Sequence, residues 1–164
     1  MLVGVLSDTH DNLPAIRAAK DLFADQHVVA MLHAGDYVAP FALKLLMEGG
    51  LPFLGVLGNN DGEREGLRRL CATLYAPPHV IELGGRTIAL THDLRDLHDT
   101  AMKGADLCVF GHTHKPEIRR GSPIMLNPGE AGGWLGGRCT VALVDLDTMA
   151  IKIVDVDTKE VWLQ

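Results

Sequence analysis

The chain has 164 residues, of which 47% are hydrophobic and 22% are charged, and its formal net charge at pH 7 is −6. This length and composition are typical of one globular domain with a sizeable core, and they exclude a disordered chain. The negative charge argues against binding of duplex nucleic acid, because proteins that grip a duplex present a clustered basic face.

Short apolar runs alternate with amphipathic segments in the first half of the chain. Each apolar run predicts a buried strand, and the segments between the runs carry apolar residues at helical spacing. Asn12 is the expected N-cap of the first helix, Pro14 lies in its first turn, and Gly49-Gly50 ends the second helix. The expected strands are 2–7, 28–32 and 52–57, and the expected helices are 12–24, 40–48 and 61–75.

The second half of the chain is richer in strands. Residues 80–91 predict two strands joined by a turn at Gly84-Gly85, and residues 106–110 predict another buried strand. Between them, residues 93–103 predict an amphipathic helix. This order predicts a single domain, residues 1–164, with an α/β core and antiparallel additions. Short strands complete it near 117–126, 138–146 and 149–156.

Polar side chains suited to metal binding follow directly after five of the predicted strands. These strand ends read SDTH, HAGD, GNND, THD and GHTH. Ligands bind beyond the carboxyl ends of the strands in open α/β sheets, so we expect these five loops to meet at one edge. The side chains expected there are Asp8, His10, Asp36, Asn59, Asn60, Asp61, His92, His112 and His114.

Each of these residues has an ordinary explanation when it is taken alone. Asn59 or Asp61 could cap the helix that follows, and His92 could be an ordinary strand-end histidine. Taken together, however, five independent coincidences at the ends of five strands are a weaker explanation than one metal centre that uses all five loops. His33, three residues before Asp36, is either a support for the ligands or a buried strand histidine. Surface or capping roles are expected for His27, His79 and His98.

The composition of the ligand set favours two metal ions. Two aspartates, one asparagine and four histidines exceed the four ligands of a structural zinc site, which is usually rich in cysteine. A mixed oxygen and imidazole set suits two first-row divalent ions that share a bridging carboxylate. Such a pair, typically ~3.5–4 Å apart, stabilises in-line displacement at phosphorus.

The same motifs resemble those of a known enzyme family. D-x-H at 8–10, GD at 35–36, GN at 58–59, His92 and GHTH at 111–114 resemble the calcineurin-like metallophosphoesterase superfamily. FGHTHKP (110–116) and NPG (127–129) are similar to segments of its small prokaryotic single-domain phosphodiesterase branch. The resemblance covers most of the chain, up to about residue 130. It implies an α/β fold, a four-layer αββα sandwich of two mixed β-sheets flanked by helices, with the metal site at the C-terminal ends of the strands.

The resemblance also implies an activity and a ligand assignment. The implied activity is the hydrolysis of small, nucleotide-like phosphodiesters through a metal-bridging hydroxide. Mn²⁺ is the expected metal, with Ni²⁺, Fe²⁺ or Zn²⁺ as alternatives. Asp36 would bridge the two ions, and the candidate catalytic residues are Asn60, Asp61 and His112. The other ligands would divide into Asp8, His10 and His114 for one ion and Asn59, His92 and His112 for the other.

Three positions depart from the pattern of the family. Many superfamily phosphatases have a histidine where this chain has Asn60, and an amide cannot usefully donate a proton to a leaving group. Asp93 stands where many relatives have glycine, so it is expected to narrow or charge the metal rim. Glu130 stands where close relatives often have Ser or Thr. It should therefore either point away from the phosphate or narrow the range of substrates that the site accepts. Together with Asp61, these acids favour diesters over the more highly charged monoesters.

Two other functions are compatible with the same motifs. A eukaryotic retromer subunit resembles this branch and serves mainly in assembly, which makes a protein-interaction scaffold the main alternative. A regulatory metal- or nucleotide-binding module with little turnover is the second. A scaffold need not keep the ligands of an active site, and every expected ligand position is filled in this chain. The enzyme is therefore the favoured hypothesis.

Cysteine usage and the N-terminal segment bear on where the protein works. Cys71, Cys108 and Cys139 form no close-spaced pair, and such a scattered set suits a reducing cytosol. MLVGVLSD lacks the basic leader and cleavage site of a signal peptide, and no apolar stretch approaches a membrane span. We expect a cytoplasmic protein with a small phosphodiester substrate and no membrane partner. A homodimer or higher homo-oligomer is left open.

Overall fold

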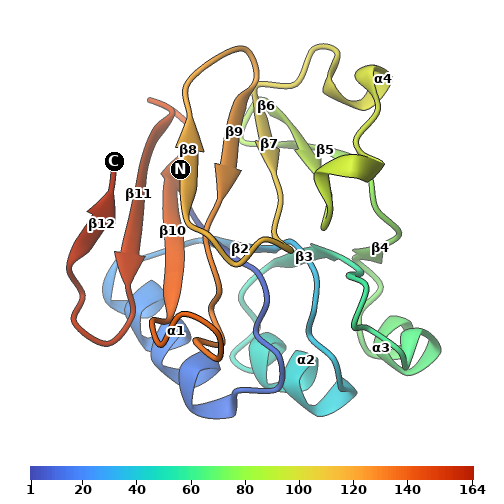
Figure 1. Cartoon of the computed structure of the whole chain (residues 1–164), viewed down its shortest axis with the longest axis vertical. Coiled ribbons are helices and arrows are strands. Elements are labelled where there is room, and N and C mark those ends of the chain that lie inside the picture. The colour runs from blue at the N-terminus through green and yellow to red at the C-terminus, as the bar shows by residue number, and fades with distance from the viewer.

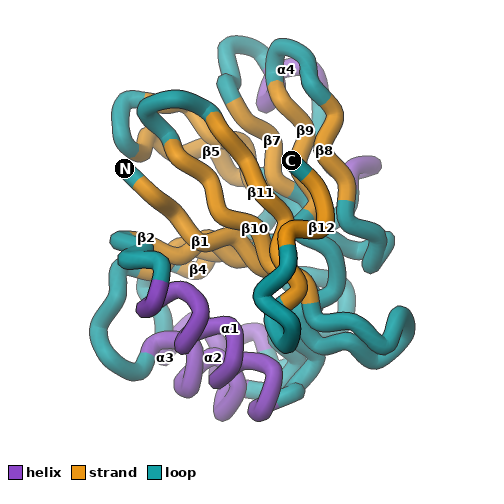
Figure 2. Tube along the Cα trace, turned by 90° about the vertical axis from the view of Figure 1, so that its left-hand side faces the viewer, coloured by secondary structure: helices purple, strands orange, loops and turns teal.

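Two β-sheets packed face to face form the centre of the protein, and three helices cover the outer face of the larger sheet (Figures 1 and 2). The computed structural model describes the backbone of residues 1–164 and every side chain except those of Asp99 and Ala101. Each sheet contains both parallel and antiparallel strand pairs. The expected α/β fold with two mixed sheets is therefore confirmed.

The larger sheet has seven strands in the order β12-β11-β10-β1-β2-β3-β4. Its parallel part consists of β1 (Leu2–Leu6), β2 (Ala30–His33), β3 (Phe53–Val56) and β4 (Leu74–Tyr75). Its antiparallel part consists of β10 (Thr140–Asp145), β11 (Ala150–Asp155) and β12 (Val161–Leu163). β10 and β11 are antiparallel additions that the sequence predicted, and β12 was not expected.

The smaller sheet has five strands in the order β5-β6-β7-β9-β8. Gly84 and Gly85 form the predicted turn between β5 and β6, and both have positive φ, at 57° and 73°. β6, β7 and β9 run parallel to one another, whereas β5 and β8 are antiparallel edge strands. The bounds are β5 (His79–Leu83), β6 (Arg86–Leu90), β7 (Leu107–Val109), β8 (Glu117–Arg119) and β9 (Ile124–Asn127).

Three helices pack on the larger sheet: α1 (Leu13–Asp25), α2 (Pro40–Met47) and α3 (Arg64–Leu70). Asn12 caps α1 as predicted, because its Oδ1 accepts a hydrogen bond from the backbone N–H of Ala15 at 3.2 Å. Among the described residues, no helix is both long and apolar enough to cross a bilayer.

Two of the predicted helices are longer than the helices that the structure has in these segments. The helix expected over 61–75 covers only α3, because residues 74–75 pair with β3 as β4. The segment 93–103 holds a 3₁₀ turn (Leu94–Asp96) and the single-turn α4 (Asp99–Met102) in place of one helix. Long-range strand pairing decided the first case, and the apolar periodicity of the segment could not indicate it.

The core lies in two layers that follow the alternation of side chains along the strands. Val3 and Val5 of β1 point between the sheets and meet residues such as Ile88 and Leu107 from the smaller sheet. The opposite face of the larger sheet packs on the helices. The outer face of the smaller sheet has only a small cluster, around Cys108. The expected fourth layer of the sandwich is thus present as a short segment and lacks a long helix.

Gly4 sets how closely α1 approaches β1. A Cβ atom at this position would lie 2.7 Å from the ring carbons of Phe23, which is too close for carbon atoms to pack. We predict that Gly4→Ala lowers the free energy of unfolding by roughly 1–3 kcal/mol, the usual cost of overpacking a core. Denaturant unfolding at constant metal content measures this loss.

Gly62→Ala is the matched control for that prediction. No atom lies within 4 Å of a Cβ built at Gly62. Its free energy of unfolding should therefore change by no more than about 0.5 kcal/mol. An equal loss in the two variants would contradict the packing explanation.

Candidate metal centre

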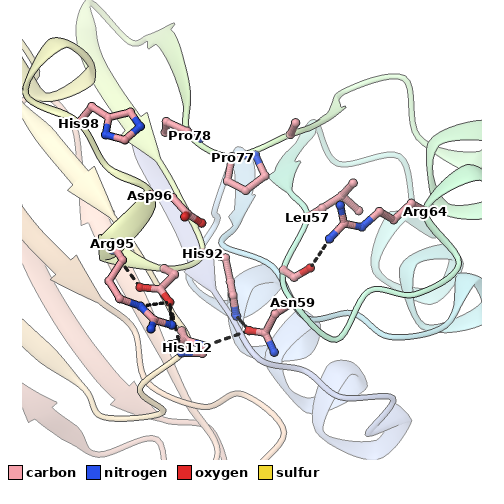
Figure 3. A pocket seen from close by; sticks show the side chains of 13 residues that line it. Leu57, Asn59, Arg64, Pro77, Pro78, His92, Arg95, Asp96, His98 and His112 are labelled. Carbon is pink, nitrogen blue, oxygen red and sulfur yellow. Dashed lines mark hydrogen bonds and ion pairs between the residues drawn. The ribbon is translucent and has the colours of Figure 1, made fainter.

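Parallel strands of both sheets end at the same side of the molecule. The loops after β1, β2 and β3 come from the larger sheet, and those after β6 and β7 come from the smaller one. All five predicted ligand loops therefore converge, and Figure 3 shows Asn59, His92 and His112 meeting from three of them. The loop after β9 adds Glu130, which lies beside His114.

Several ligand residues occupy a backbone conformation that side chains seldom adopt. A positive φ costs free energy for a non-glycine residue, so neighbouring structure must hold it in place. The backbone N–H groups of Asp8 and His10 donate to the carbonyl groups of Gly35 and Asp36, at 3.0 and 3.1 Å. These bonds tie the first ligand loop to the second. The residues with positive φ include Asp8 (54°), His10 (42°), Asp36 (63°), His112 (66°) and His114 (59°).

Glycine in the GN and GH motifs allows the ligand loops to come close together. A Cβ at Gly58 would lie 2.1 Å from Oδ1 of Asp36. A Cβ at Gly111 would lie 2.6 Å from Oδ2 of Asp8. A larger residue at either position would displace a carboxylate that is itself a ligand candidate. These glycines are therefore part of the site, although they carry no ligand atom.

Asp8, His10 and His114 form the first group of candidate ligands. Oδ1 of Asp8 lies 3.7 Å from Nε2 of His10 and 3.4 Å from Nε2 of His114. Oδ1 of Asp8 and Nε2 of His10 are buried and have no hydrogen-bond partner among the described side chains. Buried polar atoms without partners are costly, and a bound cation would satisfy both. The donor set fits a divalent metal ion.

Asp36, Asn59, His92 and His112 form the second group. Oδ1 of Asn59 lies 2.9 Å from Nε2 of His92 and 2.9 Å from Nδ1 of His112. Oδ2 of Asp36 lies 3.3 Å from Nε2 of His92. Asp8, Asp36 and His92 can also reach a common ion, so the two groups adjoin each other. The mixture of carboxylate, amide and imidazole donors again fits a divalent ion.

Asp36 is held as a carboxylate by its neighbours. Burial alone would raise its pKa, but the hydrogen bond and charge of His92 and two donors of Asn60 lower the pKa to about 2. The two Asn60 donors are the backbone N–H, at 2.8 Å, and the side-chain Nδ2, at 2.7 Å. Asp36 therefore presents a full negative charge to a metal ion at neutral pH.

Contacts behind the ligands orient the imidazole rings. Nδ1 of His92 lies 2.8 Å from the carbonyl oxygen of Ala34, which leaves Nε2 to face the site. Such a hydrogen-bond partner fixes the tautomer and the orientation of a metal-binding histidine. Nδ1 of His114 lies 3.3 Å from Oε1 of Glu130 without forming a hydrogen bond to it.

Two residues outside the candidate ligand set, His33 and Asn127, support the ligand loops. His33 is fully buried, accepts a hydrogen bond from the N–H of Gly35 at 3.1 Å and lies 3.2 Å from Oγ1 of Thr9. It is therefore a support for the ligand loops, one of the two roles expected for it. Asn127 of the NPG motif was not predicted as a site residue. Its Nδ2 donates to the carbonyl oxygen of Gly111 at 3.0 Å and so holds the GHTH loop.

Asp61 is enclosed by backbone groups, a position that suits support of the loops, and its catalytic role stays a prediction. It is only 1% exposed, and its carboxylate accepts hydrogen bonds from the backbone N–H groups of Asp36, Val38 and Gly58. Burial raises its pKa, and these hydrogen bonds partly offset that effect. Asp61 positions the loops that carry Asp36 and Asn59.

The carboxylates of the other two acids, Glu130 and Asp93, are each held by a neighbouring group. Glu130 is buried beside His114, and its carboxylate accepts a hydrogen bond from the backbone N–H of Trp134 at 2.8 Å. Asp93 lies at the rim, 3.4 Å from Nε2 of His112. Its hydrogen bonds with Arg95 lower its pKa to about 2, and the guanidinium offsets its charge. The expectation that three acids together repel monoesters is therefore not supported by their positions.

A sequence model of the calcineurin-like phosphoesterase superfamily domain matches residues 1–149 of the chain. The chain belongs to this superfamily. The expected family is confirmed, and with it the assignment of the protein as a metal-dependent phosphoesterase.

Characterised relatives share most of the chain. Phosphodiesterase MJ0936 of Methanocaldococcus jannaschii is 31% identical over 90% of this chain and 94% of its own length. Phosphodiesterase YfcE of Escherichia coli K12 is 27% identical over 88% of each. The solved structure of an archaeal phosphodiesterase has a TM-score of 0.83 at 30% identity, covering 94% of this chain and 99% of that one.

The fold alone extends to more distant proteins. Vacuolar protein sorting 29 from Cryptosporidium parvum has a TM-score of 0.72 at 19% identity and covers 99% of this chain and 95% of its own. At that identity the similarity concerns the fold and carries no conclusion about activity.

The position of Asp61 generates a prediction about stability. In Asp61→Asn one carboxylate oxygen becomes an NH₂ group, which faces backbone N–H donors and cannot accept from them. We predict a loss of roughly 2–3 kcal/mol in the free energy of unfolding, the scale for broken hydrogen bonds to a charged group. Denaturant unfolding of the metal-free protein measures it. Asp157→Asn, at an exposed acid, should change stability little, and equal effects would refute the supporting role of Asp61.

Proposed function

We propose that the protein is a dinuclear-metal-dependent phosphodiesterase that hydrolyses small, nucleotide-like phosphodiesters. The position of Asp36 carries this proposal. Its Oδ2 lies 3.7 Å from Nε2 of His10 in the first ligand group and 3.3 Å from Nε2 of His92 in the second. A carboxylate that reaches both groups is suited to bridge two divalent ions.

The proposed ligand assignment follows from the two groups. One ion would be held by Asp8, His10 and His114 and the other by Asn59, His92 and His112, with Asp36 between them. When bound, such a pair of ions supplies the hydroxide nucleophile and offsets the negative charge that develops at phosphorus. Mn²⁺ is the proposed metal, with Ni²⁺, Fe²⁺ and Zn²⁺ as alternatives.

Two residues of the chain are proposed to handle the substrate directly. Asn60 is exposed beside Asp36, where its amide can donate a hydrogen bond to a phosphoryl oxygen. The side chain of His112 is 36% exposed, and this residue is the candidate proton donor to the leaving group. Neither role requires Asp61, which is enclosed by backbone N–H groups.

A cavity of about 710 Å³ opens from the second ligand group and supports a substrate larger than a simple alkyl phosphate (Figure 3). Ligand pockets in proteins are commonly ~300–1,000 Å³. Asn59, His92 and His112 line the inner end of this cavity, and Pro77 and Arg64 line its outer walls. An ester group attached to a phosphate at the metals would extend into this space.

A diester is the proposed substrate class for a chemical reason. An alkoxide or phenoxide leaving group needs either a proton donor or an intrinsically low pKa, and Asn60 replaces the histidine that would serve as the donor. The two relatives named as phosphodiesterases support the same class. The intact ligand set supports an enzyme over a scaffold or a regulatory binding module on the same fold.

The two-metal proposal predicts how ligand variants behave. We expect two divalent ions per chain at saturation, counted by elemental analysis after chelation and reloading, and Mn²⁺ as the best activator. Asp36→Ala should lose both ions and at least ~10³-fold in kcat, since it removes a charge-stabilising element, whereas His10→Ala should keep one ion. His27→Ala, at an exposed residue just after α1, is the control. Saturation of the wild type with one ion would rule out the dinuclear assignment.

The role of Asn60 predicts the substrate preference. We expect a higher kcat/KM for bis(p-nitrophenyl) phosphate than for p-nitrophenyl phosphate, because the missing proton donor matters less for an easily expelled group on a singly charged diester. Asn60→His should raise monoester hydrolysis, and Asn60→Ala should not, which separates the gain of an imidazole from the loss of the amide. Faster monoester hydrolysis by the wild type would contradict the diester assignment.

A further inference from the structure

Two large apolar side chains project into solvent at the rim of the metal centre. Leu135 is 78% exposed and Trp134 is 64% exposed, the highest values among the large apolar side chains that the structure describes. Both lie on the loop between β9 and β10. An exposed tryptophan forgoes the burial that usually stabilises so large a side chain, and tryptophan at such a position is often part of a binding surface.

The loop that carries these side chains is fixed to the metal ligands. The carboxylate of Glu130, which lies beside His114, accepts hydrogen bonds from the backbone N–H groups of Trp134 at 2.8 Å and Leu135 at 3.0 Å. The indole Nε1 of Trp134 donates to the carbonyl oxygen of His10 at 3.0 Å. The ring of Trp134 is therefore held beside the first ligand group by two separate contacts.

Trp134 and Leu135 share a cavity with residues of the metal centre. This open cavity has a volume of about 330 Å³ and is lined by His10, Asn60, His114, Glu130, Trp134 and Leu135. The larger cavity is lined by a different set of ligands, Asn59, His92 and His112. Cavities thus adjoin both ligand groups of the metal centre. A diester has two ester groups, and each cavity can receive one of them.

We propose that Trp134 forms a stacking platform for the nucleobase of a nucleotide ester whose phosphate is bound at the metal centre, an inference that rests on the proposed function. The indole has a flat aromatic face, and the cavity that it lines is open. Stacking of this kind tolerates any base, because every base has a π-face. Leu135 extends the apolar surface next to the ring.

The proposal is tested by the binding of two ligands that differ only by a base. Adenosine 5′-monophosphate and ribose 5-phosphate carry the same phosphate, so the ratio of their dissociation constants isolates the adenine. Isothermal calorimetry on the metal-loaded protein should give about tenfold or more tighter binding of the nucleotide to the wild type, as expected for stacking on an aromatic side chain. In Trp134→Ala this ratio should fall to near one, while ribose 5-phosphate binds as in the wild type.

Two further variants separate stacking from other roles of the indole. Trp134→Phe keeps an aromatic face but loses the N–H that contacts His10, so it should retain most of the base preference. Trp162→Ala removes the other tryptophan, whose ring packs on Arg138, and should leave the ratio unchanged. A wild-type ratio near one, or a preference that survives in Trp134→Ala, would overturn the stacking platform. A base preference without hydrolysis of any diester would instead overturn the proposed function and leave the platform in place.

Discussion

The burial of two aspartates, Asp8 and Asp36, is the constraint on which the rest of the site depends. Their exposed fractions are 0% and 1%, and a carboxylate removed from water costs several kcal/mol unless donors or a cation compensate it. Asn60 and His92 compensate Asp36 in part, but Oδ1 of Asp8 has no hydrogen-bond partner among the described side chains. Divalent ions would supply the missing positive charge, which explains why four histidines from three loops must come this close.

The buried acids of the protein serve two different purposes. Asp61 and Glu130 direct their oxygen atoms at backbone N–H groups and thereby hold loops in place. Asp8 and Asp36 keep at least one oxygen facing the imidazoles of the centre. The same residue type is therefore structural in one position and ligand-like in another, and only the direction of the carboxylate separates the two. This division removes acidic charge from the side where a phosphate would bind.

The fold places the tightly packed ligand loops next to open cavities. Backbone hydrogen bonds between loops and close contacts at Gly58 and Gly111 leave the ligand residues little freedom. Beyond the ligands, the surface opens into two cavities, one bounded by Arg64 and Pro77 and the other by Trp134. The walls of these cavities thus combine candidate ligands with residues that lie outside the ligand set.

The sequence by itself determined the family, most of the strands of the core and the side chains that converge, because parallel strands place their following loops at one edge. Only the tertiary structure decided how the acids are used, since two of the N–H groups that enclose Asp61, those of Asp36 and Val38, belong to another loop. It also decided that the helix over 61–75 gives way to β4, which pairs with β3. The place of Trp134 beside His10, 124 residues earlier in the chain, likewise depends on a long-range contact that local sequence patterns cannot encode.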